Sequence, residues 1–205
     1  MNKRVVIIGA GGHSKVVADI VRENGDIVVG FLDDSYTEKR EFYASSVIGR
    51  VSDYTEYKSD CEFIIAIGSN EVRKRISGEL HCNWYTAIHP RAVLSKSAKV
   101  GVGTCVMANA VINADACVGE HSIINTGSII EHDCKIGGFT HIAPRSVVCG
   151  VTKVGECVWV GTGSTVINLI NICDGVFIGA GGVVVKDITE AGTYVGVPAR
   201  KIKLK

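Results

Sequence analysis

An aliphatic residue recurs at every sixth position through more than the last half of this 205-residue chain. All sixteen positions of the series, from Leu94 to Val184, hold Leu, Val or Ile. A six-residue period does not match the turn of an α-helix, whereas it suits short strands separated by tight corners. The series therefore predicts a parallel β-helix. Its members are Leu94, Val100, Val106, Ile112, Val118, Ile124, Ile130, Ile136, Ile142, Val148, Val154, Val160, Val166, Ile172, Ile178 and Val184.

Small residues stand two positions before most of these aliphatic residues, for example Ala110, Ser128 and Ser146. Because side chains alternate across a strand, both positions are expected to point into the tube. Glycine often follows the aliphatic residue, as at Gly119 and Gly137, where we expect it to allow an unusual corner conformation. A β-sandwich would need turn signals every 8 to 12 residues or so and would not hold this phase.

The first part of the chain has a different pattern. Residues 4–8, 27–32 and 63–67 read as buried strands, and residues 14–24 and 71–80 read as helices. This alternation predicts a Rossmann-like βαβαβ domain with a parallel sheet, in which ligands bind beyond the carboxyl ends of the strands. We therefore divide the chain into a nucleotide-sugar-type α/β domain over residues 1–85 and a β-helix over residues 86–205.

The turn after the first predicted strand is rich in glycine. Gly11, Gly12 and His13 can bring backbone N–H groups close to a phosphate at the start of the following helix. Asp33 and Asp34, at the end of the second strand, can accept hydrogen bonds from a ribose or a uracil. The spacing departs from the GxGxxG dinucleotide motif, because Ser14 occupies the last glycine position, so NAD is the weaker alternative.

Composition excludes several classes of protein. The chain has 22 basic and 21 acidic residues and a net charge of +1, which argues against a nucleic-acid or polybasic membrane surface. Its apolar runs are shorter than the roughly 20 residues of a membrane helix, and its start lacks the features of a signal peptide, so we expect a cytoplasmic protein. The eight cysteines are scattered singly, which favours reduced thiols over disulfides or a structural zinc site.

Five motifs together resemble the bacterial nucleotide-amino-sugar N-acetyltransferases of the hexapeptide-repeat acyltransferase superfamily. They are residues 9–15, 31–34, 67–73, the Glu131-His132-Asp133 triplet and residues 195–200. Bacillosamine-type and perosamine acetyltransferases are members, and proteins called sialic acid O-acetyltransferases are close relatives. The resemblance implies a left-handed β-helix and a homotrimer with active sites between subunits. It also implies acetyl transfer from acetyl-CoA to the 4-amino group of a UDP- or dTDP-linked 4-amino-4,6-dideoxy sugar, without a metal.

The resemblance also implies roles for individual residues. Transfer to an amine needs a base, which imidazole supplies near neutral pH. The family's base falls at His132, with Asp133 raising its basicity, and His141 is expected to contact the acetyl-CoA thioester. Backbone contacts to the cofactor are expected at Gly150, Thr162 and Ala180. Substrate contacts are expected at Gly11, Gly12, His13, Asp33, Asp34, Gly68, Arg73 and Asn125.

Three alternatives stay open at this point. A similar site could O-acetylate a sialic acid, and a trimeric β-helix could be a sugar-nucleotide-binding scaffold without activity. A γ-class carbonic anhydrase would hold zinc on three histidines, but His121, His132 and His141 are 11 and 9 residues apart and do not form that family's close pair. The motifs favour a nucleotide-linked acceptor and leave its nucleobase (UDP, dTDP or GDP) and sugar open.

Overall fold

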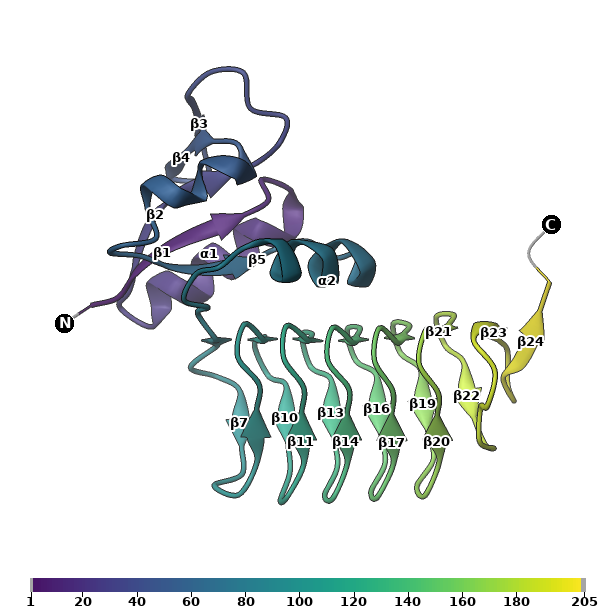
Figure 1. Ribbon diagram of the computed structural model, residues 1–205. Coiled ribbons are helices and arrows are strands. Elements are labelled where there is room, and N and C mark those ends of the chain that lie inside the picture. Colours follow the sequence, from purple (N-terminus) through teal and green to yellow (C-terminus); the bar gives the residue numbers. More distant parts are fainter. Residues whose placement is uncertain (1, 204–205) are drawn as a thin grey trace.

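The computed structural model describes residues 2–203, which form an N-terminal α/β domain packed on a triangular prism of short strands (Figure 1). The α/β domain contains a five-stranded sheet in the order β3-β4-β2-β1-β5, with β3 antiparallel to β4 and the other neighbours parallel. Its elements are β1 (Arg4–Ile8), α1 (Gly12–Glu23), β2 (Ile27–Leu32), β3 (Arg40–Phe42), β4 (Ser45–Gly49), the 3-10 helix η1 (Val51–Glu56), β5 (Glu62–Ile65) and α2 (Asn70–Glu79).

The three expected strands and two expected helices of this domain are all present. The connection from β2 to β5 differs from the expected helix, because it runs through the β3–β4 hairpin and η1. Tyr43 and Ala44 turn this hairpin with positive φ angles of 46° and 54°. Such a turn usually carries glycine or asparagine, so the sequence lacked the signal that would have revealed it.

The second unit is a parallel β-helix whose strands contain two or three residues each. Each strand pairs with the strand one coil later, 18 residues along the chain, as in the series Ile112, Ile130 and Val148. Its strands are β6 (Ala87–Ile88), β7 (Val93–Leu94), β8 (Lys99–Val100), β9 (Cys105–Val106), β10 (Val111–Ile112), β11 (Cys117–Val118), β12 (Ile123–Ile124), β13 (Ile129–Ile130), β14 (Lys135–Ile136), β15 (His141–Ile142), β16 (Val147–Val148), β17 (Lys153–Val154), β18 (Trp159–Val160), β19 (Thr165–Val166), β20 (Asn171–Ile172), β21 (Val176–Ile178) and β22 (Val183–Val184).

The coils stack into three flat faces. The domain-side face runs from β6 through β9, β12, β15 and β18 to β21, and it continues into β23 (Gly192–Val195) and β24 (Arg200–Ile202). The second face contains β7, β10, β13, β16, β19 and β22, and the third face contains β8, β11, β14, β17 and β20. We call the corner between the domain-side and second faces the near corner, and the corner between the second and third faces the far corner.

The repeated aliphatic residues fill the prism. From Val106 to Val184 every member of the series is buried, and only Leu94 and Val100 in the first coil are partly exposed. The glycines that follow them have a steric reason rather than the expected conformational one. Gly119 has no positive φ, but a Cβ there would lie 2.4 Å from the backbone nitrogen of Gly138 in the next coil. Glycine is therefore required because the coils approach each other closely.

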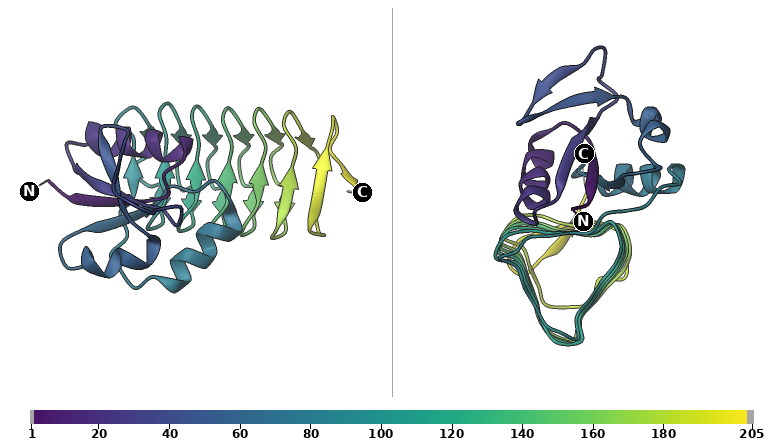
Figure 2. Two further views of the ribbon diagram at one scale, coloured as in Figure 1. Left: turned by 90° about the horizontal axis from the view of Figure 1, so that it is seen from above. Right: turned by 90° about the vertical axis from the view of Figure 1, so that its left-hand side faces the viewer.

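The α/β domain packs along the domain-side face, as the end-on view in Figure 2 shows. Trp84 is the last residue that pairs with the domain's sheet, and Ala87 begins the first strand of the β-helix. Val17 and Ala18 of α1 share one buried cluster with Cys105 and Ile123 of the prism. The two units therefore have a common apolar core along their contact.

A β23–β24 hairpin lies at the C-terminal end of the prism (Figure 1). All eight cysteines are free thiols. Among residues 2–203, no helix has the length and apolar character needed to cross a bilayer.

Candidate active site

The carboxyl ends of β1, β2 and β5 form an open edge of the α/β domain. The Gly9 N–H donates to the Leu32 carbonyl at 2.7 Å, which holds the turns after β1 and β2 together. Gly11 caps α1 and Gly12 is its first residue, and a Cβ at either position would meet no atom within 4 Å. The first N–H groups of a helix have no partner within the helix, so this turn offers them to an anion.

The two aspartates after β2 have different surroundings. Asp33 accepts hydrogen bonds from the Ala10 N–H at 2.8 Å on Oδ2 and from the Ser35 N–H at 2.9 Å on Oδ1. Burial opposes its charge, but the bonds from Ser35 and Ala10 keep its pKa below the usual value. Asp34 is exposed and accepts from the Val51 N–H at 3.2 Å. Asp33 therefore braces the glycine turn, whereas Asp34 faces solvent.

Arg73 of α2 is buried at the contact between the two units. Its Nη1 donates to the Ile67 and Gly68 carbonyls at 3.0 and 2.9 Å. Its Nε donates to the His121 carbonyl, and its Nη2 donates to Asn70 Oδ1 and the Phe139 carbonyl. Burial lowers the pKa of Arg73 to about 10, so the guanidinium remains charged at neutral pH.

The geometry of Arg73 corrects one expectation. We expected Arg73 to contact the substrate, but its five N–H groups are all donated to protein oxygens, so none is free for a ligand. Its role is to fasten the turn after β5 and the start of α2 to the β-helix. Gly68 keeps an open side, because a Cβ there would meet no atom within 4 Å.

Three histidines lie close to this cation. Burial, together with the charge of Arg73, lowers the pKa of His13 and of His121 to about 4. The same two causes, with a smaller contribution from His13, lower the pKa of His141 to about 3. All three rings are therefore neutral at pH 7, and each has one buried nitrogen without a protein partner: His13 Nε2, His121 Nδ1 and His141 Nδ1.

The tautomer of His141 follows from its neighbour Asn125. The Thr126 N–H donates to Asn125 Oδ1 at 2.8 Å, so the amide nitrogen of Asn125 faces His141 Nε2 at 2.9 Å. An amide nitrogen only donates, so Nε2 accepts and Nδ1 carries the ring proton. His141 is only 5% exposed and packs edge-on against Trp159, with ring centroids 4.2 Å apart. It therefore holds a buried N–H donor for which the protein supplies no acceptor.

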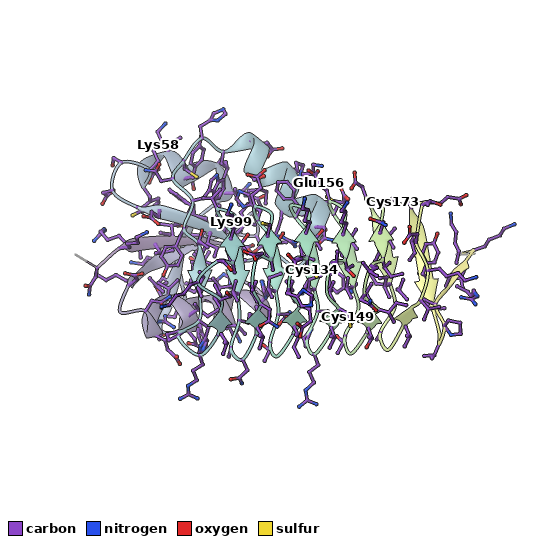
Figure 3. The ribbon with its side chains drawn as sticks, turned by 90° about the horizontal axis from the view of Figure 1, so that it is seen from below. Lys58, Lys99, Cys134, Cys149, Glu156 and Cys173 are labelled. Atoms are coloured by element: carbon purple, nitrogen blue, oxygen red, sulfur yellow. The ribbon has the colours of Figure 1, made fainter. Side chains whose placement is uncertain are left out.

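His132 and Asp133 form a pair at the far corner. Asp133 adopts the left-handed conformation (φ 59°), which aspartate tolerates better than most residues. Its Oδ2 lies 2.8 Å from His132 Nδ1, and both side chains are more than half exposed. A carboxylate accepts the Nδ1 proton, which leaves the lone pair of Nε2 free to take a proton from a substrate. Figure 3 shows this side of the β-helix, with Cys134 and Cys149 along it.

The expected site residues fall into separate places within one chain. Gly150 is at the far corner beneath His132, whereas Asn125, Thr162 and Ala180 are at the near corner. The far corner is opposite the domain-side face that carries the α/β domain (Figure 2). A single chain therefore does not bring His132 to the open edge at Gly11 and Gly68.

The sequence analysis missed two residues at the contact between the units. Trp159 lies one coil after His141, stacks on Phe177 at 5.7 Å and lines a cleft of about 280 Å³ beside Ser69. Its register relative to His141 could have revealed it. Asn70 donates to the Val158 carbonyl at 3.0 Å, and no local motif signals this contact. No cluster of three potential metal ligands occurs within residues 2–203.

The repeat of 18-residue coils, the α/β domain with its glycine turn and the exposed histidine–aspartate pair define a hexapeptide-repeat acyltransferase. Residues 4–80 match the family model of the PglD N-terminal domain. The acetyltransferase domain of PglB from Neisseria gonorrhoeae FA1090 is 34% identical, covers 98% of this chain and 100% of its own, and superposes with a TM-score of 0.92. The chain belongs to this family of hexapeptide-repeat sugar N-acetyltransferases.

Further relatives agree with this assignment. PerB from Caulobacter crescentus, solved in complex with CoA and GDP-perosamine, is 36% identical, covers 97% of both chains and superposes with a TM-score of 0.90. UDP-N-acetylbacillosamine N-acetyltransferase from Bacillus subtilis (strain 168) is 39% identical over 113 residues. That alignment spans 52% of this chain and 52% of the Bacillus protein. The expected family and the expected left-handed parallel β-helix behind an α/β domain are confirmed.

Proposed function

We propose that this protein transfers an acetyl group from acetyl-CoA to the 4-amino group of a nucleotide-linked 4-amino-4,6-dideoxy sugar. The observation that carries the proposal is the exposed His132–Asp133 pair, in a chain that matches sugar N-acetyltransferases over nearly its whole length. The PglB domain has been solved with acetyl coenzyme A, and PerB with CoA and a nucleotide-linked amino sugar. These ligands support the same donor and class of acceptor here.

In the proposed reaction, His132 is the general base. Its Nε2 takes a proton from the sugar amine as the nitrogen attacks the thioester carbonyl carbon, and Asp133 stabilises the imidazolium through Nδ1. The resulting tetrahedral intermediate expels the CoA sulfur as the amide forms. The sulfur takes up a proton, so the products are the N-acetylated sugar nucleotide and free CoA.

The acceptor and the donor are assigned to different parts of the chain. The free N–H groups at Gly11 and Gly12 suit the diphosphate of a nucleotide sugar, with His13 and Gly68 beside it and the exposed Asp34 available to the nucleoside. Backbone groups near Gly150, Thr162 and Ala180 are proposed to hold the pantetheine arm.

His141 has the right chemistry to bind a substrate oxygen. Its Nδ1–H is a donor without a protein partner, and its lowered pKa keeps it neutral. Such a donor suits a carbonyl oxygen of the thioester or an oxygen of the sugar. Asn125 orients the ring and is proposed to act through His141.

We propose a homotrimer with active sites between subunits. His132 and the open edge of the α/β domain lie on opposite sides of one prism, so a second copy must supply one of them. The outward side chains of the second face include Val93, Val111, Ile129, Val147 and Val183, an aliphatic surface suited to a protein contact. Mixing His132→Ala chains with Gly12→Asp chains should restore activity if a complete site uses two chains; no recovery in mixed oligomers would contradict a shared site.

The first experiment is a mass-spectrometric product screen. Acetyl-CoA is offered with UDP-, dTDP- and GDP-linked 4-amino-4,6-dideoxy sugars and with free and CMP-linked sialic acid. We expect one 4-amino sugar nucleotide to gain a single acetyl group, which would place the enzyme in cytoplasmic surface-glycan biosynthesis. Acetylation of sialic acid alone would overturn the proposed acceptor, and no transfer would favour a binding scaffold.

The assigned base is tested by His132→Ala, with His81→Ala at another exposed position as the control. Loss of a general base should lower kcat by about 10²- to 10⁴-fold. Near-wild-type turnover of a folded His132→Ala protein would show that another group removes the proton.

A further inference from the structure

Gly150 lies directly beneath the imidazole of His132. It follows His132 by one coil, and the Val151 N–H donates to the His132 carbonyl at 3.0 Å, so the two coils are held in register here. A Cβ built on Gly150 would lie 2.7 Å from His132 Nε2 and 2.8 Å from Cε1. Distances under 3.0 Å do not occur for real Cβ atoms, so only glycine fits beneath the ring in this position.

Backbone conformation does not explain this glycine. Gly150 has no positive φ, and no backbone atom is among the three nearest to the Cβ that it lacks. At the same turn position of the far corner, the coils on either side carry Ala114, His132 and Asn168. Glycine is therefore needed at the one position over which the imidazole lies.

We propose that Gly150 is a positioning residue for His132, a role that rests on the proposed function. Asp133 holds the ring at Nδ1, and the bare backbone of Gly150 lets the ring lie along the corner with Nε2 above the next coil. A methyl group at position 150 would force Nε2 to retreat by about 0.7 Å to reach the 3.4 Å of an ordinary contact. His132 is half exposed, so its ring has room to swing into solvent without disturbing the coils.

The test compares Gly150→Ala with Gly138→Ala. Gly138 has the same turn position at another corner and no positive φ, but its Cβ would come no closer than 3.4 Å to any atom. We expect both variants to keep the wild-type thermal midpoint. Gly150→Ala should lower kcat by about 10- to 100-fold with an unchanged KM for the sugar nucleotide, because small displacements of a reacting group are costly. Gly138→Ala should keep the wild-type kcat.

Two further measurements separate positioning of His132 from a contact with the cofactor. In protein labelled at histidine, Gly150→Ala should shift the NMR signals of the His132 ring without any ligand, as Asp133→Asn does, while Gly138→Ala leaves them in place. The CoA dissociation constant measured by calorimetry should be unchanged. Unmoved His132 signals, or a normal kcat, in Gly150→Ala would overturn the proposal.

The design also separates this inference from the proposed function. In a His132→Ala background, Gly150→Ala should have no further effect on residual turnover. If His132→Ala kept wild-type turnover, the assigned base would be wrong, whereas the ring signals would still report whether Gly150 sets the position of His132.

Discussion

Acidification should destabilise this protein through histidines that are buried in the neutral form. His121 is only 3% exposed, stacked on Phe139 at 5.5 Å and edge-on to Trp84 at 4.7 Å. Burial and the charge of Arg73 lower its pKa to about 4. An unfolded chain restores an ordinary value of about 6.5. Below pH 6.5 the unfolded state therefore takes up a proton that the folded state refuses, so stability is full above pH 6.5 and is lost as the pH falls towards 4.

The size of the loss follows from the same two values. Each such histidine changes the free energy of unfolding by about 1.4 kcal/mol per pH unit within this window. Between pH 7.5 and 5.0 His121 alone should account for about 2 kcal/mol. His13 and His141, with pKa values of about 4 and 3, act in the same direction. The carboxylate of Asp33, whose pKa is below 3.8, protonates only at lower pH and leaves this window clear.

Urea unfolding at pH 7.5, 6.5, 5.5 and 5.0, at one protein concentration, measures the effect. His121→Phe keeps an aromatic ring in the stack and cannot titrate, and His81→Gln controls for the loss of an exposed imidazole. We expect the stability lost between pH 7.5 and 5.0 to be smaller by about 2 kcal/mol in His121→Phe than in the wild type. Equal losses in the two proteins would refute the assignment of a buried neutral histidine.

Two other substitutions test how the chain is held together. Arg73→Met should lower the free energy of unfolding by about 3 kcal/mol, because five buried oxygens lose a donor, and should raise the pKa of His13, as measured by NMR; an unchanged stability would show that the guanidinium does not fasten the two units. Gly119→Ala should cost about 1 to 3 kcal/mol, because its Cβ would meet the Gly138 backbone at 2.4 Å. Gly138→Ala is its matched control, and equal melting midpoints for these two variants would contradict the steric explanation.

The β-helix could be predicted because every coil repeats the same environment. An aliphatic residue such as Ile130 has the same neighbours as Ile112 and Val148, so its local sequence shows both its burial and its phase. The bounds of β1 and β2 were also predicted, since each is a short apolar run that ends at a turn signal. The β3–β4 hairpin was not, because it is polar and its turn lacks glycine or asparagine.

The site was predictable where chemistry is local and not where it depends on packing. The His132–Asp133 pair is formed by neighbours in the chain, and the structure confirms their contact. Arg73 looked like a ligand-binding residue because it follows a glycine turn. Its burial depends on the His121 and Phe139 carbonyls, 48 and 66 residues away, which no local pattern reveals.

The regular coil also makes the β-helix a molecular ruler. Each coil of 18 residues advances the chain along the prism by one strand spacing, about 4.8 Å. The number of coils before β13 therefore sets how far along the axis His132 stands from the first coil. Inserting one whole coil between Leu94 and His132 would keep the imidazole on its corner but move it one step along the axis. Any other length would rotate it onto a different side. The reach between a bound sugar and its catalytic base is thus encoded in whole multiples of 18 residues.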